Sequence, residues 1–133
     1  MKNLVFCAIG YKDNYGNSVN INLDGFRATE IYLKNTFVAL KSIQTQNNND
    51  DVAVVVNFII PEYYMKLFEA NNIKTYFCEF DDFKFPPNFK WALAFYKLCA
   101  YKFVIENLEY DNYLELDCDV VCNGDLSEMW SEI

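Results

Sequence analysis

The chain has 133 residues, a length that fits a single domain spanning residues 1–133 with a real hydrophobic core. Hydrophobic residues make up 53% of it and aromatic residues 18%, which excludes disorder as the overall state. The net charge of -8 argues against a nucleic-acid-binding surface, which needs a basic stripe. An acidic chain that binds an anionic ligand must reverse the local field with a cation, a lysine or a helix N-terminus.

Histidine is absent, which excludes His-dependent catalysis and disfavours a zinc site. The cysteines are odd in number, contain no C-x-x-C pair, and are expected to be reduced thiols of a cytoplasmic protein: Cys7, Cys78, Cys99, Cys118 and Cys122. No stretch has the length of a membrane span, and the N-terminus leads into a predicted strand rather than a signal peptide.

The first half of the chain alternates between strand-like and helix-like patterns. Residues 3–10 form a continuous apolar run closed by Gly10, which is typical of a central parallel strand. A long polar loop is expected at 11–24, followed by a helix at 26–46 whose apolar residues share one face. Residues 52–60 predict a second strand, β-branched and apolar on both faces.

The second half continues the alternation. Pro61 starts a predicted helix through residue 70, residues 73–78 predict a third short strand, and 79–88 are expected to be irregular. The helix predicted at 89–107 is apolar almost all round and is therefore expected to be buried. Lys97 lies inside it and needs a partner, because an unpaired buried ammonium group is costly.

Residues 113–121 are the most informative stretch. A mostly apolar run, predicted to be a buried parallel strand, ends in Asp117 and then Asp119, and ligands of open α/β sheets bind at such carboxyl ends. Two carboxylates at i and i+2 can share one divalent cation, which can neutralise a bound diphosphate. Near the end of the chain, Asp125 and Glu128 have the spacing of a capping box. The whole pattern predicts an α/β fold with a mostly parallel sheet flanked by helices.

These residues resemble a known family, the glycogenin-like glycosyltransferases of family 8, which have the Rossmann-like GT-A fold. The resemblance spans most of the chain, and its matching segments are Leu4–Gly10, Tyr32–Asn35 with Ser42 and Ile43, Tyr96–Cys99, Tyr113–Val121 and Gly124–Trp130. A D-x-D pattern alone is weak, whereas D-x-D with the upstream lysine and the downstream G-D-L-S-E-M-W is fairly specific.

The resemblance implies a retaining, metal-dependent transferase that moves a sugar from a UDP-sugar donor, UDP-glucose or similar, to an acceptor. Asp117 and Asp119 match the residues that hold Mn²⁺ (or Mg²⁺) and, through it, the donor diphosphate. Asp117 and the backbone of Cys118 would also face the ribose, and Lys97 would reach the donor phosphate or sugar. Such a cation and lysine offset the charge of the departing UDP.

The resemblance also implies where the base binds. The backbone at Ala8 and Ile9, with Gly10 nearby, would line the uracil pocket, and Tyr32 would stack on the base. Each assignment has a plainer alternative: Lys97 reaching from the helix to water, Tyr32 packing in the core, Asp125 capping a helix, and the acids solvating a turn.

The chain departs from the family pattern in three ways. It ends at Ile133, whereas the family continues with a half that supplies acceptor-binding residues, a catalytic-region carboxylate and a metal-binding histidine. A truncated or minimal GT-A domain would need water, partner groups or a second copy in a homo-oligomer to complete the site. Glu115 replaces an aromatic or apolar residue, and the insertion at 11–24 bears on the base contacts.

Three other functions fit parts of the pattern. The chain could be a UDP-sugar-binding half-domain, or a fragment of a longer glycosyltransferase, without turnover of its own. A haloacid-dehalogenase-type phosphatase would need a Ser or Thr, a lysine and further acids after the D-x-D. A nucleotidyltransferase would need a basic, glycine-rich loop, of which residues 10–14 are a poor version. The UDP-sugar glycosyltransferase is the function that the sequence favours.

Overall fold

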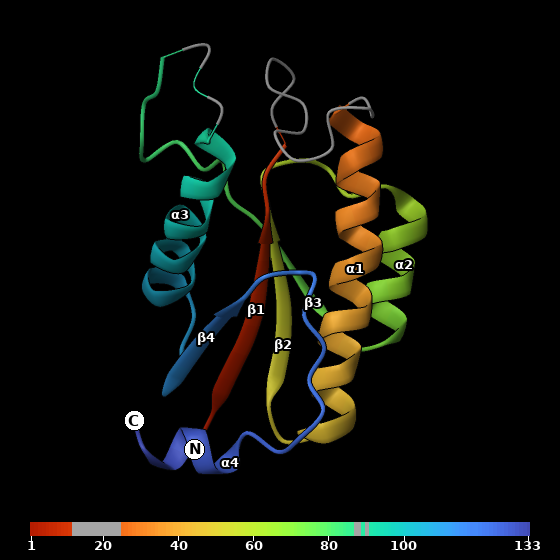
Figure 1. Cartoon of the computed structure of the whole chain (residues 1–133), viewed down its shortest axis with the longest axis vertical. Coiled ribbons are helices and arrows are strands. Elements are labelled where there is room, and N and C mark those ends of the chain that lie inside the picture. Colours follow the sequence, from red (N-terminus) through yellow and green to blue (C-terminus); the bar gives the residue numbers. More distant parts are fainter. Residues whose placement is uncertain (12–24, 87–88, 90) are drawn as a thin grey trace.

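The structure is a computed structural model that describes residues 1–11, 25–86, 89 and 91–133. Strands and helices alternate along the chain (Figure 1). In order, they are β1 (Asn3–Ile9), α1 (Gly25–Gln46), β2 (Asp51–Val56), α2 (Glu62–Ala70), β3 (Lys74–Phe77), α3 (Ala92–Asn107), β4 (Asn112–Leu116) and α4 (Ser127–Ser131).

The strands form one parallel sheet in the order β3-β2-β1-β4. From β1 the chain adds β2 and then β3 on one side. Helix α3 then crosses back over the sheet, and β4 pairs with β1 on its other side. Helices α1 and α2 cover one face of the sheet and α3 covers the other (Figure 1). The α/β fold with a parallel sheet, predicted from the alternating pattern, is confirmed.

The central strand β1 contributes to both halves of the core, because successive side chains point to opposite faces of a sheet. Val5, Cys7 and Ile9 belong to the cluster under α1 and α2. Leu4 and Phe6 belong to the cluster under α3. All five are at most 3% exposed, which explains why this run is apolar without alternation.

Strand β2 ends at Val56, four residues earlier than the predicted end at residue 60. The apolar run continues, but Asn57 turns its amide group toward the backbone of Tyr11. Ile59 is 89% exposed and lies outside the sheet. An apolar pattern cannot show this end, because the end depends on a contact with a residue 46 positions away.

Two predictions of burial were wrong. Helix α3 is not buried all round: Leu98 is 55% exposed and Ile105 51% exposed on its outward side. Strand β4 is half-buried along its whole length, because it forms one edge of the sheet. The strand does end directly before Asp117, as predicted.

The short helix α4 starts without a capping box. Asp125 Oδ1 accepts hydrogen bonds from the backbone N–H and the hydroxyl of Ser127, at 2.8 and 2.7 Å. The Asp125 carboxylate therefore closes a local turn with the residue two positions on, whereas the capping box predicted a bond to the N–H of Glu128, three positions on. Trp130 of this helix is buried, and its Nε1 donates to Asp50 Oδ2 at 2.8 Å.

The predicted loop at 11–24 lies outside the described residues apart from Tyr11, as do residues 87 and 88 of the irregular segment. Within the part of the chain that the structure describes, no helix is long and apolar enough to cross a membrane.

Candidate functional site

The candidate site lies at the carboxyl ends of β1 and β4. The connection from β1 leads to α1 on one face of the sheet, whereas β4 follows α3 on the other face. The strand order therefore reverses between these two strands, and ligands of open α/β sheets bind at such a switch point. The last pair in register is Cys7 with Leu116, so Ala8 and Asp117 follow side by side.

Asp117 and Lys97 form an ion pair at this end of the sheet. Along β4, Tyr113 packs on the α3 face and Leu116 on the α1 face, and continuing the alternation directs Asp117 toward α3. Lys97 comes from the second turn of α3, which starts at the same end. Lys97 has a partner, as predicted, and this partner is one of the two predicted metal ligands. The reason for the prediction was wrong, because the Lys97 side chain is 45% exposed rather than buried.

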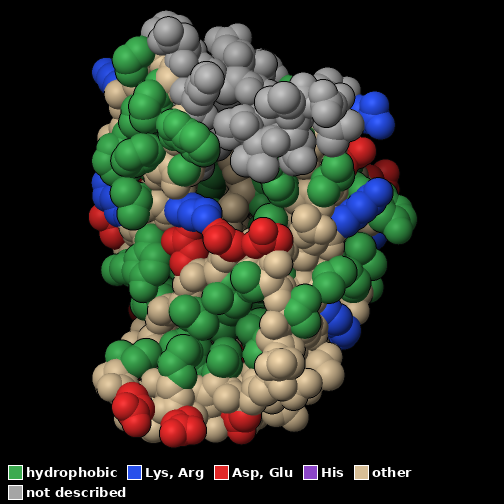
Figure 2. Space-filling view, in the orientation of Figure 1, with side chains coloured by type: hydrophobic (Ala, Val, Ile, Leu, Met, Phe, Trp, Pro, Cys, Tyr) green, Lys and Arg blue, Asp and Glu red, His purple; other side chains and the backbone are tan. Residues whose placement is uncertain are grey.

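The ion pair can be opened at little cost. The side chains of Lys97 and Asp117 are 45% and 58% exposed. Exposed ion pairs contribute about 0.2–1 kcal/mol to stability. Figure 2 shows acidic side chains gathered beside a basic one near the middle of this face. A ligand that offers a phosphate to the lysine, or a cation to the aspartate, would therefore compete with a weak interaction.

Cys118 and Asp119 form the turn that follows Asp117. The Cys118 side chain packs against the core cluster under α1. Burial raises the pKa of its thiol, the charge of Asp119 adds to this rise, and the nearby Thr36 hydroxyl opposes it. Asp119 is exposed. Cys118 thus anchors the turn in the core while its two neighbours, both carboxylates, stay accessible.

Glu115 is a site residue whose role the sequence did not indicate beyond its departure from the family pattern. It lies opposite Phe6 on the face that α3 covers. Burial raises the pKa of its carboxyl group to about 7, and the positive charge of Lys97 opposes the rise. Its Oε1 atom is buried and has no hydrogen-bond partner among the described residues. Such an unpaired oxygen in a half-buried position is a signal that only the structure reveals.

Asn57 is a second residue that the sequence analysis missed. Its Oδ1 accepts from the Tyr11 backbone N–H at 2.7 Å, and its Nδ2 donates to the Tyr11 carbonyl at 3.0 Å. The two bonds fix the chain just after β1, beside Gly10. An asparagine at the end of a β-branched run is the signal that could have found it, because it interrupts a pattern that is otherwise apolar.

The predicted base-contact residues lie at the end of β1 and on α1. Ala8 and Gly10 are half-buried, whereas the side chain of Ile9 is buried in the core. Their backbone lies next to Asp117 through the register of β1 and β4. Tyr32 is half-buried on α1 and packs against the core cluster on that side. The structure thus brings Ala8–Gly10, Lys97 and Asp117 together at the carboxyl end of the sheet. Tyr32 lies on the α1 side.

The donor set fits a hard divalent cation that keeps part of its shell for other ligands. Asp117 and Asp119 offer carboxylate oxygens, which Mg²⁺ and Mn²⁺ prefer. Among the described residues, no group of three or more acidic or cysteine side chains could hold a metal ion. Water and ligand oxygens would therefore have to complete the coordination.

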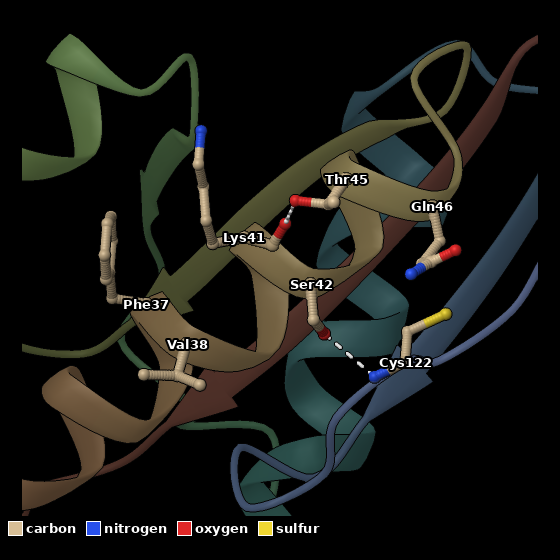
Figure 3. A pocket seen from close by; sticks show the side chains of 7 residues that line it. All are labelled: Phe37, Val38, Lys41, Ser42, Thr45, Gln46 and Cys122. Atoms are coloured by element: carbon tan, nitrogen blue, oxygen red, sulfur yellow. Dashed lines mark hydrogen bonds between the residues drawn. The ribbon is translucent and has the colours of Figure 1, made fainter.

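The groove in Figure 3 is separate from the candidate site at the carboxyl ends of β1 and β4. It has a volume of 340 Å³ and lies between α1 and the segment that follows β4. Phe37, Val38 and Cys122 give it a mostly apolar lining, and the Ser42 hydroxyl accepts a hydrogen bond from the Cys122 backbone at 2.8 Å. None of the predicted site residues lines it.

No known protein-family model matches the chain, and no curated protein is significantly similar to it. The family resemblance therefore stays a prediction from the residues of the sequence.

Proposed function

We propose that this chain is a GT-A-type domain that binds a UDP-sugar, UDP-glucose or similar, and transfers the sugar to an acceptor with retention of configuration. The observation that supports this most strongly is the pairing of Lys97 with Asp117 beside Ala8–Gly10 at the switch point of the sheet. The fold alone hosts many functions, so the proposal depends on these residues.

Asp117 and Asp119 would hold Mn²⁺ or Mg²⁺, which supplies positive charge to the donor diphosphate when bound. Lys97 would leave Asp117 and turn to a phosphate oxygen, since the ion pair is exposed and weak. Its ammonium group would then stabilise the charge that develops on the departing UDP. The protein thus contributes both the cation ligands and a mobile charge.

The end of β1 would bind the nucleoside. Backbone groups at Ala8, Ile9 and Gly10 would contact the uracil, with Tyr32 stacking on it, and the backbone of Cys118 would face the ribose. The two hydrogen bonds from Asn57 to Tyr11 support this role, because they hold the backbone beyond β1 in one position. A fixed backbone binds a base at a smaller entropic cost than a mobile one.

A binding domain without turnover is the second candidate. The position of β4 favours it, because this strand is an edge of the sheet and the described residues place no further strand beside it. The wall that would bind an acceptor, a sugar or a protein, would then come from another chain or a second copy. The free cysteines suit a cytoplasmic protein of either kind.

Calorimetric titration of UDP with and without Mn²⁺ tests the proposal. We expect binding that depends on Mn²⁺ and is abolished in both Asp117→Ala and Asp119→Ala. Asp111→Ala is the matched control, because Asp111 is an exposed aspartate directly before the start of the same strand, where its carboxylate accepts a hydrogen bond from the Lys2 backbone N–H at 2.7 Å. Unchanged binding in both site variants would refute the metal site.

An assay for UDP release from UDP-glucose then separates the two candidates. Release that requires Mn²⁺ supports a working transferase. Binding without release, with a panel of sugar and protein acceptors present, supports the binding domain. Absence of UDP binding under all conditions would overturn both.

A further inference from the structure

The carboxyl group of Glu115 lies close to the candidate site without a hydrogen-bond partner. Its Oε1 atom is buried and accepts no hydrogen bond from any described residue. A buried acceptor without a donor is costly, so folded proteins contain few of them and each one needs a reason. A donor that reaches Glu115 in a second state of the site would supply that reason.

Helix α3 contacts β4 on both sides of Glu115. The Tyr101 hydroxyl donates to the backbone carbonyl of Tyr113 at 3.3 Å, and Lys97 pairs with Asp117. Lys97 and Tyr101 lie one turn apart on α3, so the helix runs antiparallel to the strand here. Glu115 therefore lies between two contacts of the same helix, on the face of β4 that this helix covers.

The surroundings of Glu115 leave Lys97 as the group that can approach it as a donor. Phe6 lies opposite Glu115 in the register of β1 and β4, and its ring packs edge-on against that of Tyr101 at 5.7 Å. The Tyr101 hydroxyl already donates to the backbone of β4. The positive charge of Lys97, in contrast, acts on the Glu115 carboxyl group, and the lysine side chain is 45% exposed and has room to turn.

A cation at Asp117 would drive this turn. A divalent ion bound to the carboxylate repels the ammonium group that is paired with the same carboxylate. Residues 115 and 117 are successive positions on one side of the chain, roughly 7 Å apart along an extended strand. The flexible four-carbon stem of lysine can cover such a shift. Lys97 would lose its acceptor at the moment when the unpaired oxygen of Glu115 offers another.

We infer that Glu115 is a positioning residue, which receives the ammonium group of Lys97 when a divalent cation occupies Asp117. The lysine is then held at the site rather than released to water. An ammonium group has three N–H donors, so Lys97 can bond to Glu115 and to an anionic oxygen of the ligand at once. Glu115 itself touches neither the cation nor the ligand. This inference rests on the proposed cation site at Asp117 and Asp119.

Mn²⁺ binding to the nucleotide-free chain tests the inference. The spectrum of free Mn²⁺ in electron paramagnetic resonance measures it, at about pH 8, where ordinary carboxyl groups are ionised. We expect Glu115→Gln to weaken Mn²⁺ binding by about two- to fivefold, because Lys97 then has no other carboxylate to accept it and competes for Asp117. Glu109→Gln is the matched control and should bind Mn²⁺ unchanged, since Glu109 is an exposed glutamate before β4.

A double-mutant cycle separates positioning of the lysine from a direct effect of the Glu115 charge on the cation. Lys97→Met removes the ammonium group and keeps an unbranched stem, and we expect it to tighten Mn²⁺ binding. With Lys97→Met present, Glu115→Gln should bring no further change. With Lys97→Arg, which keeps the positive charge, Glu115→Gln should again weaken binding. Circular dichroism establishes that each variant is folded.

The outcomes distinguish this inference from the proposed function. Mn²⁺ binding that requires Asp117 but is unchanged by Glu115→Gln would overturn the inference and leave the cation site standing. An equal loss with and without Lys97 would also overturn it, because Glu115 would then act on the cation itself. Absence of Mn²⁺ binding to the unmodified chain, or binding that Asp117→Ala leaves unchanged, would refute the cation site and the inference with it.

Discussion

Glu115 carries a carboxyl group in surroundings that favour its protonated form. It is half-buried on β4, one of its oxygens has no partner among the described residues, and burial raises its pKa from the ordinary 4.5 to about 7 despite the nearby charge of Lys97. In the unfolded chain the same group loses its proton near pH 4.5. Between these two pH values the folded protein therefore binds a proton that the unfolded protein has released.

This difference predicts that stability falls as the pH rises from 4.5 to about 7. Glu115→Gln removes the titrating group and keeps its shape. We expect the variant to match the original protein at about pH 4.5 and to be more stable by about 1 kcal/mol at about pH 8, a figure reduced for partial exposure.

Urea unfolding at several pH values, with a chelator present, measures this difference. Glu109→Gln, at an exposed glutamate before β4, should leave the free energy of unfolding unchanged across the same range. An advantage of Glu115→Gln that does not grow with pH would show that the carboxyl group is ionised in the folded protein at low pH.

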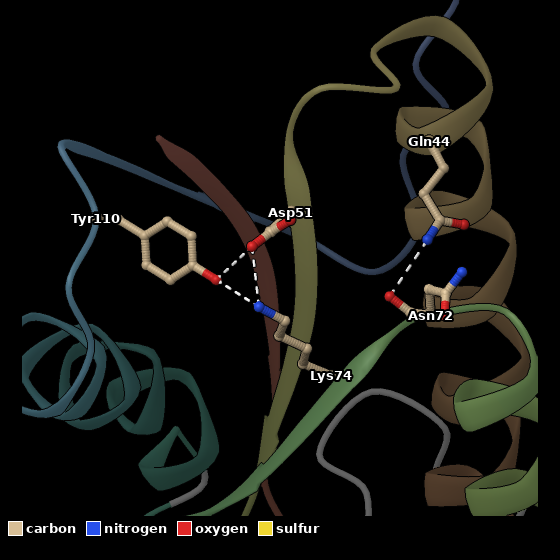
Figure 4. Close-up of polar contacts among 5 residues, drawn as sticks. All are labelled: Gln44, Asp51, Asn72, Lys74 and Tyr110. Atoms are coloured by element: carbon tan, nitrogen blue, oxygen red, sulfur yellow. Dashed lines mark hydrogen bonds and ion pairs between the residues drawn. The ribbon is translucent and has the colours of Figure 1, made fainter. Parts of the chain in front are cut away.

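The amino ends of the strands are joined by a network of three side chains (Figure 4). Tyr110 donates to Asp51 Oδ2 at 2.7 Å, and Lys74 Nζ lies 2.9 Å from both the same carboxylate oxygen and the Tyr110 hydroxyl. These residues come from the starts of β2 and β3 and from the segment before β4. Burial pushes the pKa of Asp51 upward, but the hydrogen bonds from Tyr110 and Lys74 outweigh it and hold this pKa below its usual range. The network thus joins the two outer strands to β2.

Tyr110→Phe removes the hydroxyl and keeps the ring, which packs edge-to-face against Tyr113 at 6.0 Å. We expect a loss of about 1 kcal/mol in the free energy of unfolding, because the bond to a charged carboxylate is lost. Tyr63→Phe is the matched control, since Tyr63 is 70% exposed. Chemical unfolding of both variants at neutral pH measures the difference, and an equal loss in the two would contradict a role for the network.

The elements could be predicted where the physical cause is local. The strand at residues 3–10 and the helix at 26–46 follow from runs and periods within the sequence, and the end of β4 follows from Asp117. The end of β2 could not be predicted, because Asn57 is drawn to Tyr11 by distant hydrogen bonds. The exposed side of α3 could not be predicted either, since an apolar helix face does not reveal what covers it.

The candidate site divides in the same way. Lys97 and Asp117 were assigned separately, and the expectation that Lys97 is buried predicted that it pairs with an acid, whereas the structure pairs it with an acid on an exposed surface. The strand order decides which acid pairs with Lys97. It places β4 beside β1 and under α3, so the acid is Asp117. Glu115 and Asn57 gained roles only when their neighbours were known.

At the scale of the whole molecule, the site joins a central strand to an edge strand. Ala8–Gly10 lie at the carboxyl end of β1, which pairs with β2 on one side and β4 on the other. Asp117 and Asp119 follow β4, which pairs only with β1 among the described residues. Stability within a fold decreases from fully paired, buried elements to edges. The two halves of the site should therefore differ in how readily they open.

Amide hydrogen exchange measures this difference directly. The β1 residues Leu4–Cys7 are 0% exposed, so their amides should exchange only through global unfolding. The free energy of opening calculated from their exchange rates should then equal the free energy of unfolding measured with urea. The amides of β4 should exchange faster through local opening, because the strand is half-buried and, among the described residues, pairs with another strand on one side only. Equal protection of β1 and β4 would mean that the edge opens only together with the core, and that the D-x-D turn is held as rigidly as the end of the central strand.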